Sequence, residues 1–164
     1  NLSWGNNFSY KGLSLGFLLT ARVGGIVVSQ TQAVMDSYGA SQASADARDM
    51  GGALVNGRPI DAQKYYTTVG GSGNTGGIGS MYVYSATNVR LGELSLGYDI
   101  PINKYVNWIQ GLNVSFIGKN LFFLYKKAPF DPELTASTGT YFQGIDMFMS
   151  PSLRNLGFSV KVKF

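Results

Sequence analysis

The sequence predicts an all-β fold, a transmembrane antiparallel β-barrel to which this chain contributes about five strands. Three observations support this prediction. The 164 residues include 22 Gly, 10 Tyr and 10 Phe, which suit strands and tight turns. Charged residues make up only 13%, about half the share that is usual in soluble domains. Several segments alternate apolar with polar side chains at the two-residue period of a strand, as expected between lipid and a wet lumen.

The first two expected strands form a hairpin. In the first, apolar and aromatic side chains from Leu2 to Tyr10 share a face that is opposite Ser, Gly and Asn. Lys11-Gly12 is a tight turn. Residues 13–23 then carry an apolar side chain at every odd position, and Leu18, at an even position, breaks the pattern. About ten residues suffice for a strand to cross a bilayer.

Three more strands are expected at residues 89–100, from 112 to about 123, and at 156–164. In the last, Gly157, Ser159, Lys161 and Lys163 lie opposite an apolar face. A terminal aromatic of this kind resembles the C-terminal signature by which assembly machinery recognises bacterial outer-membrane proteins. The candidate assembly signal consists of the apolar residues of that face, Phe158, Val160, Val162 and Phe164.

Two long connections separate the strands, Ser29–Thr87 and Tyr125–Asn155. Short helices are expected in the first, near residues 32–38 and 61–66. The order of connections is short, long, medium, long, so both long ones lie on one side of the sheet. Outer-membrane barrels have long extracellular loops and short periplasmic turns, which predicts that the C-terminus faces the periplasm. Five strands leave edges that lipid cannot satisfy, so we expect this chain to be part of a longer protein.

Composition argues against several functions. The chain has no Cys and no His, which removes thiolate metal sites, the commonest metal ligand and the commonest general base. We therefore expect no enzyme activity, no catalytic residues, no metal and no cofactor. The formal charge of +4 is scattered without a basic run, which is poor support for nucleic-acid binding. No stretch approaches the roughly 20 apolar residues of a membrane helix.

Two short motifs match catalytic or cofactor-binding patterns. Gly71–Gly76 matches G-x-G-x-x-G, but a dinucleotide site needs a strand before it and a helix after it, so we expect a flexible loop. Asp131-Pro132-Glu133 offers two carboxylates, as glycoside hydrolysis requires. Two acids within one Pro-containing loop favour a structural role.

Other polar and aromatic residues leave two interpretations open. Arg22, Glu93 and Lys119 fall on the lumen-facing parity of their strands. They could form a satisfied polar network on the inner wall, or they could contact a plug or line the substrate route. The long loops also carry aromatic side chains that could stack on a sugar or a peptide, or pack within the loops. These are Tyr65, Tyr66, Tyr82, Tyr84, Tyr141 and Phe142.

Four segments, in this order ahead of a terminal Phe, resemble the C-terminal end of SusC/RagA-like TonB-dependent transporters of Bacteroidetes. They are Asn88–Tyr98, Gly118–Phe122, Asp131–Glu133 and Pro151–Arg154. Phe8–Gly12 and Arg22–Gly25 are similar to that family too. The resemblance implies a 22-stranded barrel around a plug domain. Residues 1–164 would be the C-terminal portion of the barrel, without any plug.

The resemblance also implies a function. It is TonB-dependent import of oligosaccharides, or oligopeptides, across the bacterial outer membrane. The implied partners are the N-terminal barrel strands and plug of the same transporter, a SusD-like surface lipoprotein, TonB acting through the missing plug, and membrane lipid. The alternative from another class is a secreted soluble β-sandwich that binds carbohydrate. Partitioning into detergent from outer membranes would distinguish the two.

Overall fold

The computed structural model describes residues 1–72, 75–102, 108, 111–134 and 139–163. The chain divides into two compact units. The strand unit contains Asn1–Gly24, Thr87–Pro129 and Ser152–Phe164. The loop unit contains Gly25–Ala86 and Phe130–Pro151, the greater part of both long connections.

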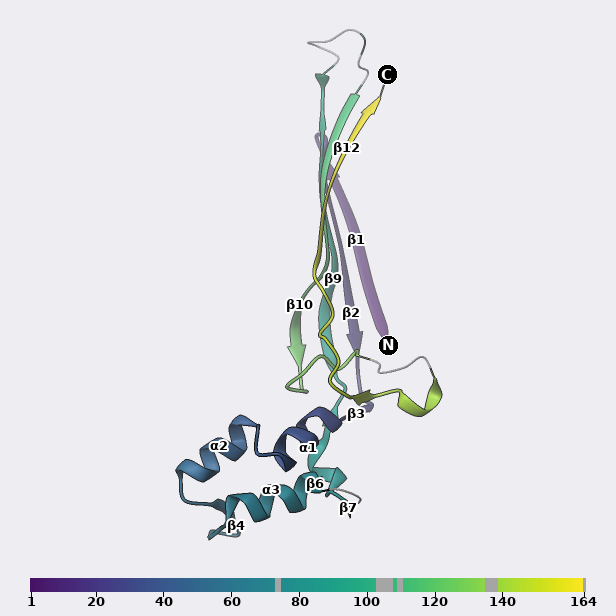
Figure 1. The fold of residues 1–164 in the computed structure, drawn as a ribbon. Helices are drawn as coiled ribbons and strands as arrows, with labels where there is room; N and C mark the ends of the chain where they lie inside the picture. Colours follow the sequence, from purple (N-terminus) through teal and green to yellow (C-terminus); the bar gives the residue numbers. More distant parts are fainter. Residues whose placement is uncertain (73–74, 103–107, 109–110, 135–138, 164) are drawn as a thin grey trace. The chain divides into compact units, whose positions relative to one another are not determined.

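The strand unit is one antiparallel sheet whose five strands follow each other in chain order. Figure 1 shows these strands as long ribbons lying side by side. The described residues are mostly β-strand with few helices, which is consistent with the predicted all-β fold, and the barrel stays a prediction. Within the described residues the sheet is open, with β1 and β12 at its edges. Its strands are β1 (Leu2–Tyr10), β2 (Leu13–Arg22), β9 (Asn88–Ile100), β10 (Gly111–Lys126) and β12 (Asn155–Lys163).

A two-residue turn joins β1 to β2. Tyr10 pairs with Leu13, and the two residues between them both have positive φ, 47° at Lys11 and 85° at Gly12. These are the angles of a type I′ turn, whose twist matches that of the flanking strands. A side chain on Gly12 would be strained at this φ, and its Cβ would lie 3.0 Å from the Asp99 carbonyl oxygen.

A bulge in β9 keeps the apolar side chains on one face. Leu18 of β2 pairs with Glu93, but Leu19 pairs with Leu91, so Gly92 is an extra residue. Apolar positions in β9 accordingly change from odd numbers before Gly92 to even numbers after it. Leu18, which breaks the alternation of β2, lies on the face of Glu93. The change of parity is the signal of this bulge in the sequence.

The connections leave the sheet as predicted. Arg22 pairs with Asn88, and Asn88 with Lys126, so the β2–β9 connection and the β10–β12 connection begin at one end of the sheet. The Lys11-Gly12 turn and the last residues of β12 lie at the other end, where Lys163 pairs with Gly111. The alternation of short and long connections is therefore confirmed as a topological feature.

Three short helices organise the loop unit: α1 (Gln30–Ser37), α2 (Gln42–Asp49) and α3 (Ala62–Gly70). Each begins at an N-cap whose side-chain oxygen accepts a hydrogen bond from a main-chain N–H three residues on; the caps are Ser29, Ser41 and Asp61. The helices predicted near residues 32–38 and 61–66 are confirmed, and α2 was not predicted. No helix among the described residues is long and apolar enough to cross a membrane.

Short strands complete the loop unit. A three-stranded sheet has the order β11-β3-β8, and two hairpins join β4 to β5 and β6 to β7. The segment expected to be a flexible loop is the β6–β7 hairpin, and it follows helix α3 instead of a strand. The strand before the motif that a dinucleotide site requires is therefore not found here. The bounds are β3 (Ile26–Ser29), β4 (Ala53–Val55), β5 (Arg58–Ile60), β6 (Gly71–Ser72), β7 (Thr75–Gly76), β8 (Val83–Ser85) and β11 (Ile145–Asp146), with 3₁₀ turns at Gly79–Tyr82 and Thr140–Phe142.

Candidate functional surfaces

Strand register brings the apolar side chains of all five strands onto one face, here called the apolar face. Residues that pair across antiparallel strands point to the same side of the sheet. Successive rows run Tyr10–Leu13–Tyr98–Val114–Val160, Phe8–Leu15–Leu96–Phe116–Phe158, and Trp4–Leu19–Leu91–Phe122. The rows are continuous because the extra residue at Gly92 restores the parity of β9.

The apolar face is exposed. Trp4, Phe8, Tyr10 and Phe158 have 58–70% of their surface accessible. Trp4 and Phe17 still contact each other edge to face, with ring centroids 5.3 Å apart. Soluble monomers rarely expose an apolar patch that extends across a whole sheet. A face of this kind is suited to contact with lipid.

The opposite face of the sheet, here called the polar face, carries small and polar side chains. One row runs Ser9–Ser14–Gly97–Ser115–Ser159. Glycines leave room for their neighbours: a Cβ on Gly16 would lie 2.4 Å from Asn7 Oδ1 and 2.5 Å from Ser95 Oγ. Such a face suits a water-filled space and not an apolar core.

Two of the three candidate lumen residues lie together. Lys119 Nζ is 3.8 Å from Glu93 Oε2, and the two residues pair across β9 and β10. Both side chains are well exposed, 58% for Lys119 and 41% for Glu93. Arg22 lies on the same face but pairs with Asn88, near the end of the sheet where the long connections begin. The polar face thus holds all three residues, and their contact with a plug or substrate stays a prediction.

Side chains from three segments of the family resemblance meet in the strand unit. The Arg90 guanidinium donates a hydrogen bond to Ser152 Oγ and lies 4.7 Å from the centroid of the Phe123 ring. Asn120, at φ 54°, donates from Nδ2 to the Leu153 carbonyl at 3.4 Å. Sequence reasoning did not predict these contacts. Its only signal was that the segments occur together in the resemblance.

The proposed assembly signal is partly described. Phe158, Val160 and Val162 lie on the apolar face of β12, opposite Phe116, Val114 and Leu112 of β10. Phe164 lies outside the described residues. The three described side chains share one face as their alternation indicates, and their contact with lipid and role in assembly stay predictions.

Aromatic residues of the loop unit largely pack within it. Tyr82 is 3% exposed and donates its hydroxyl to Asp36 Oδ2 at 2.9 Å. Burial, followed by the hydrogen bond to Asp36 and the charge of that residue, raises the pKa of Tyr82 well above the usual value of a phenol. Tyr84 packs edge to face on Phe130 at 5.7 Å. Phe142 is 43% exposed, and the side chain of Tyr141 lies outside the described residues.

The acidic pair Asp131 and Glu133 has a local structural role. The Glu133 main-chain N–H donates to Asp131 Oδ1 at 3.0 Å, which closes an Asx turn around Pro132. Asp131 is 7% exposed. Across the described part of the chain, no group of three or more His, Cys, Asp or Glu side chains could hold a metal ion.

The same fold occurs in solved structures of a transporter. Three match this chain over 99% of its length: the RagAB peptide importer in its open-open state (20% identity, TM-score 0.64), the same importer in its closed-closed state (21%, 0.66), and the RagAB peptide transporter (20%, 0.67). The chain spans only 16–17% of the length of the chains that it matches. No protein-family model and no curated protein matches it. The likeness shows that this chain has the fold of the transporter segment with which it aligns.

Proposed function

We propose that this chain is the C-terminal portion of the barrel of a TonB-dependent importer in the bacterial outer membrane. The observation that supports this most strongly is a single sheet with an exposed apolar face, a polar opposite face and strands of nine to sixteen residues. Such strands are long enough to cross the hydrocarbon layer. The free edges of β1 and β12 would pair with the other strands of a 22-stranded barrel around a plug.

The proposed mechanism is gated passage of a nutrient along the polar face, with no bond made or broken. Arg22, Glu93 and Lys119 would line the route or contact the plug, because they lie on that face. The loop unit would be extracellular and contact a SusD-like lipoprotein, and the C-terminus would face the periplasm. TonB would act through the plug, so no residue of this chain would take part in energy coupling.

The proposed cargo is an oligopeptide or an oligosaccharide. The solved structures that share the fold are named as peptide importers, which favours an oligopeptide. The strand unit itself offers serine, asparagine and glycine on its polar face. These residues suit either cargo.

Uptake by intact cells tests the proposal. A strain that lacks the full-length gene should fail to accumulate one class of labelled oligomer, and complementation should restore uptake only when TonB is present. Labelled tripeptides to decapeptides and labelled glycans of similar mass form two arms of the experiment. Unchanged accumulation of both classes, with the protein confirmed in wild-type outer membranes, would contradict the import proposal.

The soluble sandwich is the second candidate. It would need another sheet of comparable size to cover the apolar face, whereas the other described strands are two to four residues long. Recovery of the full-length protein in the soluble periplasmic or secreted fraction, without detergent, would favour it.

A further inference from the structure

The charged residues of the strand unit are distributed unequally between the two faces of its sheet. All eight that lie in the five strands are on the polar face, as the strand register shows, and the apolar face has none. Six of the eight are basic and two are acidic, which gives the polar face a net charge of +4. The basic residues are Arg22, Arg90, Lys119, Lys126, Lys161 and Lys163, and the acidic residues are Glu93 and Asp99.

Both acids of the polar face have local partners. Glu93 lies beside Lys119, with 3.8 Å between Oε2 and Nζ. Asp99 Oδ1 accepts a hydrogen bond from Asn113 Nδ2 at 2.7 Å. The two acids therefore do not compensate the cations near the ends of the strands.

Cations without an acidic partner lie toward both ends of the polar face. Arg22, Lys161 and Lys163 form no ion pair with any described residue. Arg22 pairs with Asn88 where the long connections begin, and Lys163 pairs with Gly111 at the other end of the sheet. The 13 residues of β9 separate these ends by roughly 40 Å, at about 3.3 Å per residue. One fixed acidic contact would need cations in one place, whereas a series along the whole face suits a charged molecule that moves past it.

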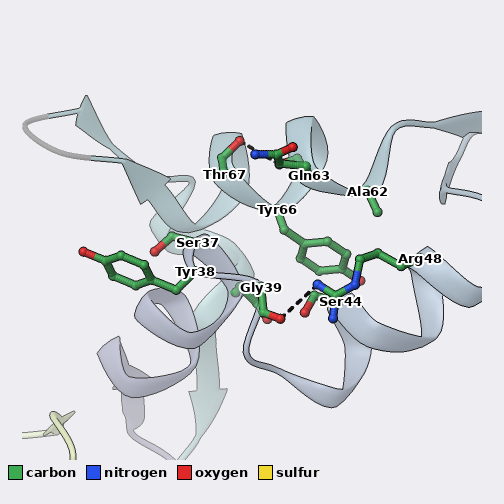
Figure 2. A pocket seen from close by; sticks show the side chains of 10 residues that line it. Ser37, Tyr38, Gly39, Ser44, Arg48, Ala62, Gln63, Tyr66 and Thr67 are labelled. Atoms are coloured by element: carbon green, nitrogen blue, oxygen red, sulfur yellow. Dashed lines mark hydrogen bonds between the residues drawn. The ribbon is translucent and has the colours of Figure 1, made fainter.

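The loop unit has no comparable excess of positive charge. Three of its seven acids are buried, and its four exposed acids are nearly balanced by three exposed bases. Arg48, for example, donates from Nη1 to the Gly39 carbonyl at 3.0 Å, beside Ser44 and Tyr66 in the hollow between the helices (Figure 2). That guanidinium is used within the fold of the loop unit. The positive charge is thus concentrated on the polar face of the sheet.

The position of these cations strengthens their effect on a solute. With lipid against the apolar face, the low-dielectric layer behind the sheet directs the field of the cations into the aqueous space. Such a field concentrates anionic solutes and disfavours cationic ones. The serines and asparagines of the same face can hydrogen-bond to main-chain amides. A peptide with carboxylate side chains is complementary to both features.

We propose that the importer selects acidic oligopeptides, and that Arg22, Lys161 and Lys163 are specificity-determining residues along the route. This inference rests on the proposed function, import of an oligopeptide, and adds the charge of the cargo. Carboxylates of the cargo make charge-assisted contacts with successive cations. Lys161 and Lys163 are exposed to solvent, so each contact is weak enough for the cargo to leave again.

Initial rates of uptake by intact cells that carry the full-length protein test the inference. The probes are labelled peptides of equal length with glutamate, glutamine or lysine at the same positions. We expect the glutamate peptide to enter fastest and the lysine peptide slowest, with about a tenfold difference between them at low salt. The difference should shrink at physiological ionic strength, where the Debye length is about 8 Å.

Two charge-neutralising variants connect this preference to the polar face. Lys161→Gln combined with Lys163→Gln should lower the ratio of glutamate-peptide to lysine-peptide uptake about threefold, because two cations are lost from the field. Arg22→Gln should lower it in the same direction without changing β12. Uptake of the glutamine peptide and the amount of folded protein in the outer membrane should stay as in the parent. Lys64→Gln, the same charge change at an exposed residue of α3, should leave the ratio unchanged.

The outcomes separate this inference from import itself. Rates that fall equally for all three peptides in the variants would show that the cations contact the plug or stabilise the barrel, and would overturn the proposal. Equal uptake of the three peptides by the parent protein would overturn it too, and so would a charge preference found only for oligogalacturonate over a neutral glycan. Import would stand in each of these cases. Absence of uptake of every peptide and glycan would contradict the proposed function and the inference together.

Discussion

Arg90 and Ser152 are 62 positions apart in the sequence, and the Arg90 guanidinium donates a hydrogen bond to the Ser152 hydroxyl oxygen. The same guanidinium lies over the Phe123 ring. One arginine therefore ties β9 and β10 to the segment that leads into β12. Two of the segments that resemble SusC/RagA-like transporters contact each other through it.

Replacing Arg90 by Lys should destabilise the strand unit, because an ammonium group cannot stack on Phe123 and hold the same fork-shaped contact. We expect a loss of about 1–3 kcal/mol from the cation–π contact and the charged hydrogen bond together. The measurement is the midpoint of heat-modifiable unfolding of full-length protein on gels. Arg154→Lys, at an exposed residue close to Ser152 in the sequence, is the control and should leave the unfolding midpoint unchanged. Equal unfolding midpoints for the two variants would show that the contacts of Arg90 with Phe123 and Ser152 do not stabilise the strand unit.

The ion pair between Glu93 and Lys119 should contribute little to stability. Its atoms are 3.8 Å apart and both side chains are well exposed, so solvent screens the attraction. A double-mutant cycle with Glu93→Gln and Lys119→Met should give a coupling of about 0.2–1 kcal/mol. If the pair lines the route, the single variants should change the rate of nutrient uptake while their unfolding midpoints stay close to that of the parent protein. A coupling of several kcal/mol with normal uptake would indicate a structural network instead.

A cation on the apolar face of β12 should impair insertion, whereas the same cation one residue earlier should be tolerated. Val160 pairs with Val114 on the apolar face, and Ser159 pairs with Ser115 on the polar face. Val160→Arg should cost roughly 2–4 kcal/mol if the residue lies near the bilayer midplane. Ser159→Arg is the matched control. Folded protein in purified outer membranes is the readout, and similar amounts of both variants would refute the assignment of the two faces.

The stability of the loop unit should fall at alkaline pH. Burial raises the pKa of Tyr82 in the folded state, so folding favours the protonated phenol. This contribution is fully present below the unfolded pKa of about 10 and is lost as the pH rises above it. Tyr82→Phe should lose the hydrogen bond at neutral pH but show a shallower alkaline loss. Near-UV circular dichroism from about pH 8 upward checks this. If the near-UV signal of the parent protein and that of Tyr82→Phe fell equally steeply with rising pH, the prediction would be contradicted.

The strands could be predicted because apolar and polar side chains alternate along them at the two-residue period of a strand. The alternation of β12 also indicated that Phe158, Val160 and Val162 share a face, and parity indicated that Glu93 and Lys119 do. The contact between Arg90 and Ser152 could not be predicted from alternation, because Ser152 lies outside the strands. Helix α2 has the sequence QASADARD, without a strong apolar stripe, so its capping by Ser41 was the only local signal. The short strands of the loop unit pair across the long connections, which periodicity cannot reveal.

The most direct test of the central claim is a spin-label scan along β2, which is paired on both sides by β1 and β9. The chain has no cysteine, so single-cysteine variants at residues 13–21 report on one position each if the rest of the full-length protein is also made cysteine-free. In outer-membrane vesicles, the account predicts that odd positions such as Leu15, Phe17 and Leu19 are accessible to oxygen dissolved in lipid. Even positions such as Ser14 and Gly16 should be accessible to a water-soluble nickel reagent. Odd positions protected from both reagents, as in the core of a soluble sandwich, would contradict the account.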